Sequence, residues 1–155
     1  MALEIERKFL LLNEDWQPQA SRSARYRQGY LTEGGRCSIR VRVAGARAFL
    51  NIKSATLGIR RTEYEYPLPL AEAQEMLSAF TLGGEVVKTR HFVEYGQHTW
   101  EIDVFEGVNQ GLVVAEVELA DEEEAFERPP WLGQEVSDDP RYYNVYLAHH
   151  PYHSW

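Results

Sequence analysis

Apolar and polar residues alternate with a period of two along most of the chain, which is typical of β-strands. Ile39, Val41 and Val43 share one face of such a segment, and Arg40 and Arg42 lie on the other. The pattern predicts eight strands, over residues 3–11, 25–31, 38–43, 48–54, 59–66, 85–95, 99–105 and 112–119. Because short turns join most of them, the sequence predicts an antiparallel meander or a closed barrel.

Two segments depart from this period. Residues 70–80 place Leu70, Ala73, Leu77 and Phe80 on one side, which predicts an amphipathic helix. Residues 138–140 read Asp-Asp-Pro, which is typical of a helix start, and this helix is expected to reach about residue 149. A short acidic helical turn is expected over residues 121–126. The chain is therefore expected to be mainly β, with two or three helices.

Composition indicates one globular domain and limits where in the cell the protein is expected to be. The chain has 155 residues, 44% hydrophobic and 26% charged. No apolar run approaches the ~20 residues of a membrane span, and the charged N-terminus is unlike a secretory signal. The single cysteine, Cys37, excludes an internal disulfide, so a cytoplasmic location is expected. A net charge of −8 argues against a partner nucleic acid bound over the whole surface.

The polar faces of the strands carry like-charged pairs spaced two residues apart, and both members of a pair point to the same side. Two interpretations stay open: a sheet with its charged face in water, or an inside-out barrel whose charged faces line a lumen. Arginine pairs bind phosphate oxygens and carboxylate pairs bind hard divalent cations, which favours the lumen. The pairs are Glu4/Glu6, Arg40/Arg42, Glu63/Glu65, Lys88/Arg90, Glu101/Asp103 and Glu116/Glu118, with Lys8 and Lys53 in phase.

The charge of such a lumen predicts a metal requirement. Its six cations face eight carboxylates, a balance of −2, which would not attract a polyanion unaided. A triphosphate carries about four negative charges near neutral pH. If the lumen binds phosphates, divalent metal is therefore expected to be obligatory.

These residues resemble a known family. Glu4-Ile5-Glu6-Arg7-Lys8 is similar to the E-x-E-x-K signature of the CYTH domain, the triphosphate tunnel metalloenzyme superfamily, and the charged pairs follow in the family's order. Residues 28–31, Gln-Gly-Tyr-Leu, resemble the short bacterial members. The resemblance implies one CYTH domain over residues 1–155. It also implies an α+β, mainly β fold: an eight-stranded antiparallel closed barrel, the triphosphate tunnel, with a few peripheral helices.

The resemblance further implies an enzyme: a divalent-metal-dependent phosphohydrolase that cleaves the terminal phosphoanhydride of a triphosphate. Inorganic tripolyphosphate is the expected substrate and Mg²⁺ or Mn²⁺ the expected cofactor. A homodimer is expected, with no nucleic-acid or membrane partner. The alternatives are a class IV-type adenylate cyclase, a thiamine triphosphatase, and a non-catalytic binder of polyphosphate or nucleotide.

Roles for the site residues follow from the resemblance and from their chemistry. Lys8 and Tyr30 are expected to be catalytic, as a pair that positions water or steadies the leaving group; the alternative for Tyr30 is a packed strand aromatic. The expected metal ligands are Glu4, Glu6 and Glu118, with Glu63 and Glu116 beside a second metal or a water. The expected phosphate-binding residues are Lys8, Arg40, Arg42, Lys53, Lys88 and Arg90.

Overall fold

The structure, a computed structural model, describes residues 2–155, and in this range nine strands form one antiparallel sheet. The observed strands contain the eight predicted segments almost completely, and several extend beyond them. Their bounds are β1 Leu3–Leu11, β2 Ala20–Tyr30, β3 Cys37–Ala44, β4 Arg47–Ser54, β5 Arg60–Leu68, β6 Leu82–Tyr95, β7 His98–Phe105, β8 Val113–Leu119 and β9 Leu132–Glu135.

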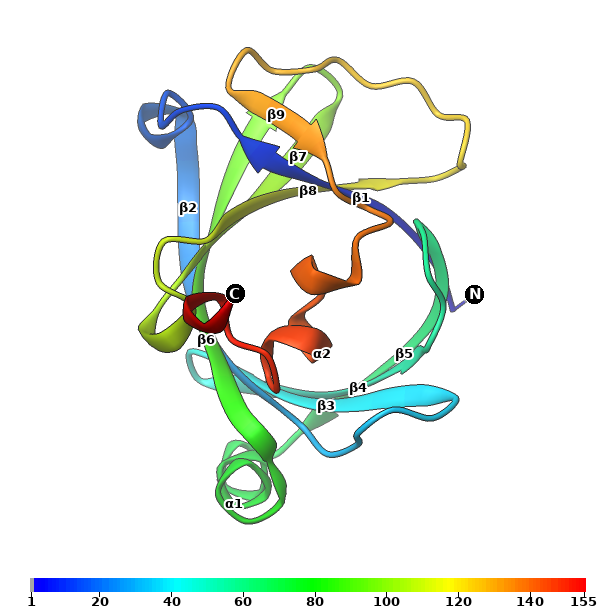
Figure 1. The fold of residues 1–155 in the computed structure, drawn as a ribbon, viewed down its shortest axis with the longest axis vertical. Helices are drawn as coiled ribbons and strands as arrows, with labels where there is room; N and C mark the ends of the chain where they lie inside the picture. The colour runs from blue at the N-terminus through cyan, green and yellow to red at the C-terminus, as the bar shows by residue number, and fades with distance from the viewer. Residues whose placement is uncertain (1) are drawn as a thin grey trace.

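Eight of these strands close into a barrel, in the order β1-β8-β7-β6-β2-β3-β4-β5 (Figure 1). Closure comes from a short antiparallel pairing between the two ends of this order, where Glu4 of β1 lies opposite Arg61 of β5. The ninth strand, β9, pairs with the distal half of β1 and had no counterpart among the predicted strands. The predicted eight-stranded closed antiparallel barrel is therefore confirmed.

The apolar core lies outside the bore. One cluster packs Phe9, Trp100 and Trp131 between the outer barrel face and the segment that leads into β9. A second packs Ala73 and Leu77 of α1 (Leu70–Phe80) against the outer faces of β3 and β4. Because the apolar side chains point outward to these covers, the alternating charged residues point inward. The inside-out arrangement is confirmed over the sheet with a solvated charged face.

The predicted helix over residues 70–80 is confirmed, but the C-terminal helix is shorter than expected. Residues 140–149 form a 3₁₀ turn (Pro140–Tyr142) and a short α2 (Asn144–Leu147), separated by the extended residue Tyr143. The Tyr143 hydroxyl donates to the carbonyl of Ser137 at 2.6 Å and accepts from the amide of Gly58 at 3.2 Å. Of residues 121–126, where a short helical turn was expected, only 121–124 form a turn, which is closed by a hydrogen bond from the Glu124 amide to the Asp121 carbonyl.

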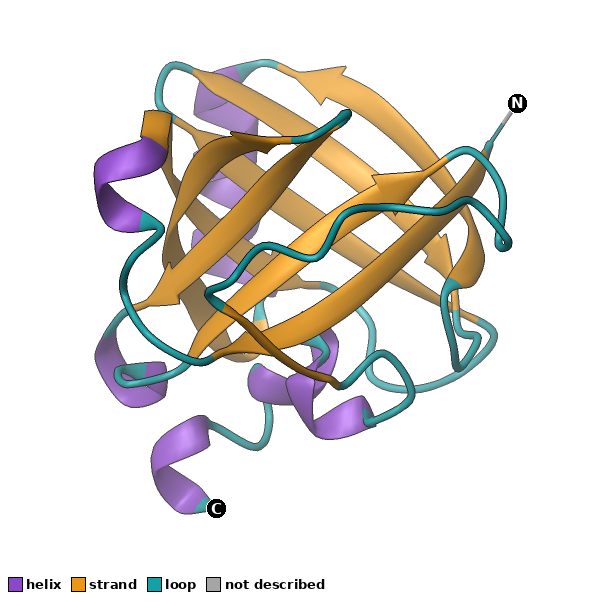
Figure 2. Cartoon of the chain, turned by 90° about the horizontal axis from the view of Figure 1, so that it is seen from above, coloured by secondary structure: helices purple, strands orange, loops and turns teal. Residues whose placement is uncertain are grey.

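The short α2 lies over one end of the bore. It lies within the ring of strands when the barrel is viewed end on, and at one end of the barrel from the side (Figures 1 and 2). The backbone amide of Gly84 on β6 anchors it by donating to the Ala148 carbonyl at 2.9 Å. Further 3₁₀ turns are Gln17–Gln19, Gly107–Asn109 and Tyr152–Ser154. No helix among residues 2–155 is long and apolar enough to cross a membrane.

Candidate functional site

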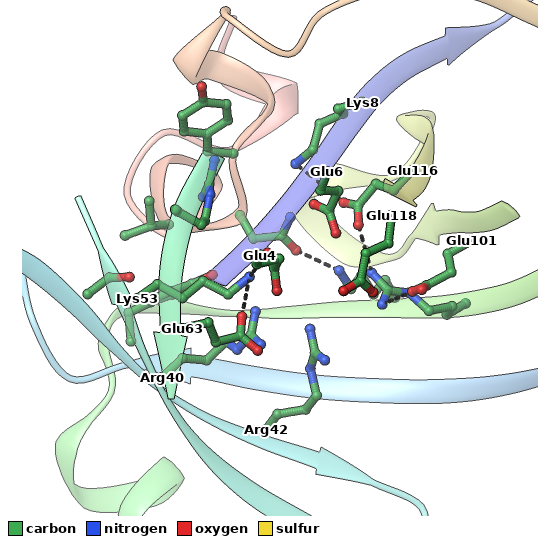
Figure 3. A pocket seen from close by; sticks show the side chains of 18 residues that line it. Glu4, Glu6, Lys8, Arg40, Arg42, Lys53, Glu63, Glu101, Glu116 and Glu118 are labelled. Carbon is green, nitrogen blue, oxygen red and sulfur yellow. Dashed lines mark hydrogen bonds and ion pairs between the residues drawn. The ribbon is translucent and has the colours of Figure 1, made fainter. Parts of the chain in front are cut away.

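A cavity of ≈200 Å³ occupies the bore (Figure 3). Its lining draws on all eight barrel strands and on the chain around α2. Every residue that was given a catalytic, metal-binding or phosphate-binding role from the sequence lies in this lining, so the structure brings all of them together. The lining is Glu4, Glu6, Lys8, Tyr30, Ser38, Arg40, Arg42, Lys53, Arg61, Glu63, Lys88, Arg90, Glu101, Glu116, Glu118, Tyr143, Asn144 and Val145.

The charges of this lining are segregated around the barrel. Going round the barrel, the adjacent strands β4, β3, β2 and β6 contribute cations and neutral polar residues, and no carboxylate of the lining. The adjacent strands β7, β8, β1 and β5 contribute all six lining carboxylates. We call these halves the cationic wall and the carboxylate wall. Lys8 and Arg61 are the cations of the carboxylate wall.

Lysines lie between the members of the carboxylate wall. Lys53 Nζ reaches across from β4 to Glu63 Oε2 at 2.9 Å and Glu4 Oε1 at 3.4 Å. Lys8 Nζ lies 3.4 Å from Glu116 Oε1. Among residues 2–155, no group of three or more His, Cys, Asp or Glu side chains is arranged so that it could hold a metal ion.

The pKa values of two carboxyl groups in this wall are shifted in opposite directions. Burial and, after it, the charge of Glu116 raise the pKa of Glu6 to about 8, and the opposing charge of Lys53 does not offset them. Burial also disfavours the charge of Glu116, but Lys8 and Arg90 outweigh it and hold that pKa well below its usual range. The raised pKa of Glu6 therefore reflects its burial first and the negative charge of Glu116 second.

The cationic wall contains two guanidinium groups without carboxylate partners. Within residues 2–155, no Asp or Glu oxygen lies within 4.0 Å of a side-chain nitrogen of Arg40 or Arg42. Burial, followed by the charges of Arg40 and Arg90, lowers the pKa of Arg42 to about 10. Arg42 nevertheless stays cationic near neutral pH. Neither guanidinium would have to break an ion pair with a carboxylate in order to bind an anion in the bore.

Lys88 and Arg90 both form ion pairs with one carboxylate, that of Asp103, which does not line the cavity. Asp103 is fully buried; Arg90 grips it with two parallel hydrogen bonds of 2.8 and 2.9 Å, and Lys88 donates to it at 2.7 Å. Arg90 also contacts Glu101 and Glu116. Burial raises the pKa of Asp103, but Arg90 and Lys88 outweigh it and lower the pKa.

The charge balance predicted for the lumen was wrong. Asp103 lies behind the lining, and Glu65 is exposed and accepts a hydrogen bond from Asn51 at 2.7 Å instead of entering the bore. Arg61, in contrast, joins the lining. Seven cations therefore face six carboxylates, a balance near neutral instead of −2. A metal requirement must be argued from the segregated walls and not from a net negative lumen.

Five lining residues were not predicted for the lumen from the sequence: Ser38, Arg61, Tyr143, Asn144 and Val145. Arg61 was visible, since it lies two positions before Glu63 on the same strand face. Tyr143 and Asn144 carry no periodic signal, because they reach the bore from an irregular segment near α2.

The predicted pair of Lys8 and Tyr30 shares the cavity without a direct hydrogen bond between the two among the described residues. Lys8 Nζ donates to the Tyr142 carbonyl at 3.1 Å and lies 5.5 Å from the centre of the Tyr143 ring. Tyr30 is buried with Val86 in an apolar cluster while it also lines the bore. Their catalytic pairing stays a prediction.

Comparison with known proteins agrees with this architecture. Residues 2–143 match the model of the CYTH domain. The chain is 41% identical over 152 residues to an inorganic triphosphatase of Acetivibrio thermocellus, which covers 98% of this chain and 97% of that protein. It is 39% identical over 150 residues to an inorganic triphosphatase of Nitrosomonas europaea, covering 94% and 96%. A crystal structure of an inorganic triphosphatase superposes with a TM-score of 0.68 at 38% identity, covering 94% and 97%. The chain belongs to the CYTH domain family.

Proposed function

We propose that this protein is an inorganic triphosphatase: with a divalent metal, it hydrolyses tripolyphosphate to pyrophosphate and orthophosphate. The observation that carries the proposal is the division of one enclosed cavity into a cationic wall and a carboxylate wall. A polyphosphate bound to the first wall and metal bound to the second would share the bore. The two relatives near 40% identity, both inorganic triphosphatases, support the same activity.

The size of the cavity favours an inorganic substrate. Pockets for drug-sized ligands measure about 300–1,000 Å³, whereas this cavity measures ≈200 Å³. A triphosphate chain fits such a volume better than a whole nucleotide. We therefore rank tripolyphosphate above ATP or thiamine triphosphate as the substrate.

The carboxylate wall fits a hard divalent cation, Mg²⁺ or Mn²⁺. Its donors are carboxylate oxygens from neighbouring strands. The charge of Glu116 adds to burial in raising the pKa of Glu6, and a bound cation would favour the ionised form of that carboxyl. Glu4, Glu6 and Glu118 would hold the metal, with Glu63 and Glu116 beside a second metal or a water. When bound, the metal would polarise phosphate oxygens and lower the pKa of a bound water.

The remaining polar side chains would bind and orient the substrate. Phosphoryl transfer is catalysed mainly by positioning and by neutralising charge on the equatorial oxygens. Lys8 and Tyr30 are proposed to position the attacking water or to steady the leaving phosphate. The groups proposed to bind phosphate oxygens are Lys8, Arg40, Arg42, Lys53, Lys88 and Arg90.

A substrate panel tests this function. Purified protein is incubated with tripolyphosphate, ATP or thiamine triphosphate, each with Mg²⁺ or Mn²⁺, and the products are separated by chromatography. Orthophosphate and pyrophosphate from tripolyphosphate, with slower turnover of the other two, is the expected result. Cyclic AMP and pyrophosphate from ATP would indicate a cyclase, and tight binding measured by calorimetry without turnover would indicate a binding protein.

We also propose a homodimer in the reducing cytoplasm. The dimer rests on the resemblance to short bacterial members, and the location on a single free cysteine, Cys37. Light scattering during size-exclusion chromatography measures the assembly, and a monomeric mass at micromolar concentration would contradict the dimer.

A further inference from the structure

Lys88 is the most enclosed cation of the site. Its side chain is 1% exposed, and its ammonium donates to Asp103 Oδ2 at 2.7 Å and to Asn144 Oδ1 at 2.9 Å. An ammonium has three N–H groups. Since Lys88 also lines the cavity and makes no third hydrogen bond within the described residues, one N–H is left for a ligand in the bore.

Asn144 is itself held in one orientation by a buried chain of hydrogen bonds. Its Oδ1 also accepts from Nε2 of Gln28 at 2.8 Å, and Oε1 of Gln28 accepts from Nε of Arg42 at 3.1 Å. Gln28 is fully buried. Because Lys and Arg can only donate, the cations at the two ends determine which way both amides point.

We propose that Asn144 is a positioning residue for the reaction: together with Asp103 it directs the free N–H of Lys88 at a substrate phosphate oxygen, and Gln28 keeps its amide in the required orientation. This inference rests on the proposed triphosphatase function. It gives α2 a role in the active site, since Asn144 at the start of this helix is the neutral residue that accepts a hydrogen bond from Lys88. It also links Lys88 to Arg42, two phosphate-binding groups on different strands.

The alternative is that Asn144 only attaches the C-terminal segment to the barrel. Two substitutions at this position separate the two roles. Asn144→Leu keeps the branched shape of the side chain but removes the acceptor, whereas Asn144→Asp keeps the acceptor and adds a negative charge. Burial lowers the pKa of Lys88 to about 7, with Asp103 and Glu116 opposing this effect and Arg90 and Arg42 reinforcing it. The two variants should therefore move that pKa in opposite directions.

The experiment measures kcat and KM for tripolyphosphate with Mg²⁺ between pH 6 and 9.5, and Tm for each variant. Asn144→Leu should lower kcat/KM by about 10- to 100-fold, the factor expected for one hydrogen bond to a buried charge. The alkaline limb of its pH profile should move to lower pH, and that of Asn144→Asp to higher pH. Tyr146→Phe, on the same helix, is the matched control and should match the wild type.

Other outcomes overturn the proposal. If Asn144→Leu retains the wild-type kcat/KM, or if both limbs move in the same direction, Asn144 does not position Lys88. If Asn144→Leu does not fold, the alkaline limb of Asn144→Asp still decides. A wild-type protein without tripolyphosphatase activity would contradict the proposed function instead; calorimetric binding of Mg²⁺–tripolyphosphate to the same variants over the same pH range would then test the positioning role separately.

Discussion

Glu6 on β1 lies directly opposite Glu118 on β8, so two carboxylates face each other across neighbouring strands of the tunnel wall. Like charges in directly opposed positions destabilise a sheet. The next pair on this face, Lys8 and Glu116, has opposite charges and forms an ion pair. The repulsion between Glu6 and Glu118 therefore has no such compensation within this pair. A divalent cation bound between these two carboxylates would stabilise the fold.

The first prediction concerns stability without metal. The pKa of Glu6 is about 8 in the folded protein against an ordinary value of 4.5, so the folded state binds the extra proton between these values. The stability of the metal-free protein should therefore fall as pH rises through this window. In EDTA, Glu6→Gln should flatten the curve of Tm against pH and be more stable than wild type at pH 8.5, by about 1–3 kcal/mol. Parallel curves for the two proteins would contradict the assignment.

Glu4 is predicted to be required for metal binding. Glu4→Ala should lower orthophosphate release by more than about 100-fold, a larger effect than the 10- to 100-fold typical of residues around a metal site. It should also abolish the rise in Tm that Mg²⁺ produces in the wild type. Glu123→Ala, which removes an exposed carboxylate, is the control and should leave both measurements unchanged. A Glu4→Ala protein that Mg²⁺ still stabilises to the wild-type extent would exclude Glu4 as a ligand.

Arg42 is predicted to need its guanidinium and not only its charge. Arg42→Lys keeps a cation but loses the planar fork that binds phosphate and donates to Gln28. The expected loss in kcat/KM is about 100-fold. Arg47→Lys, an exposed substitution on the neighbouring strand, should have no effect. Equal activity of Arg42→Lys and wild type would show that charge alone suffices.

Tyr30 is predicted to act through its hydroxyl. Tyr30→Phe keeps the ring packed beside Val86 and removes only the oxygen. A catalytic hydroxyl predicts a fall in kcat of at least about tenfold, with Tm nearly unchanged. If kcat stays at the wild-type value, Tyr30 is a packing residue, as the alternative interpretation of the sequence has it.

Neutralising Asp103 is predicted to lower the free energy of unfolding more than neutralising any other acidic residue. Asp103→Asn leaves Lys88 and Arg90 buried without their carboxylate, which should destabilise the fold by about 3–5 kcal/mol in urea unfolding. The pKa of Asp103 is lowered in the folded protein, so its contribution is present above the ordinary value of 3.8 and is lost as pH falls through the folded value. The difference between Asp103→Asn and wild type should therefore shrink in acid. A constant difference would show that its charge is unimportant.

The amino-acid sequence by itself determined the strands, the position of α1 and the phase of the charged residues. Such features depend on neighbours two to four positions apart, which is why Glu4, Glu6, Arg40 and Arg42 could be assigned to common strand faces from the pattern alone. The resemblance to the CYTH family then supplied the closed barrel and the roles of these residues.

Only the tertiary structure decided which charged residues share the cavity and which support it from outside. Closure depends on pairing between β1 and β5, far apart in the sequence, and this pairing admits Arg61 while the other end of β5 turns Glu65 to solvent. Asn144 reaches Lys88 from an irregular segment whose course is set by distant contacts, such as that between Gly84 and Ala148. Contacts between such distant segments leave no periodic pattern in the chain, because they depend on how whole elements pack and not on local spacing.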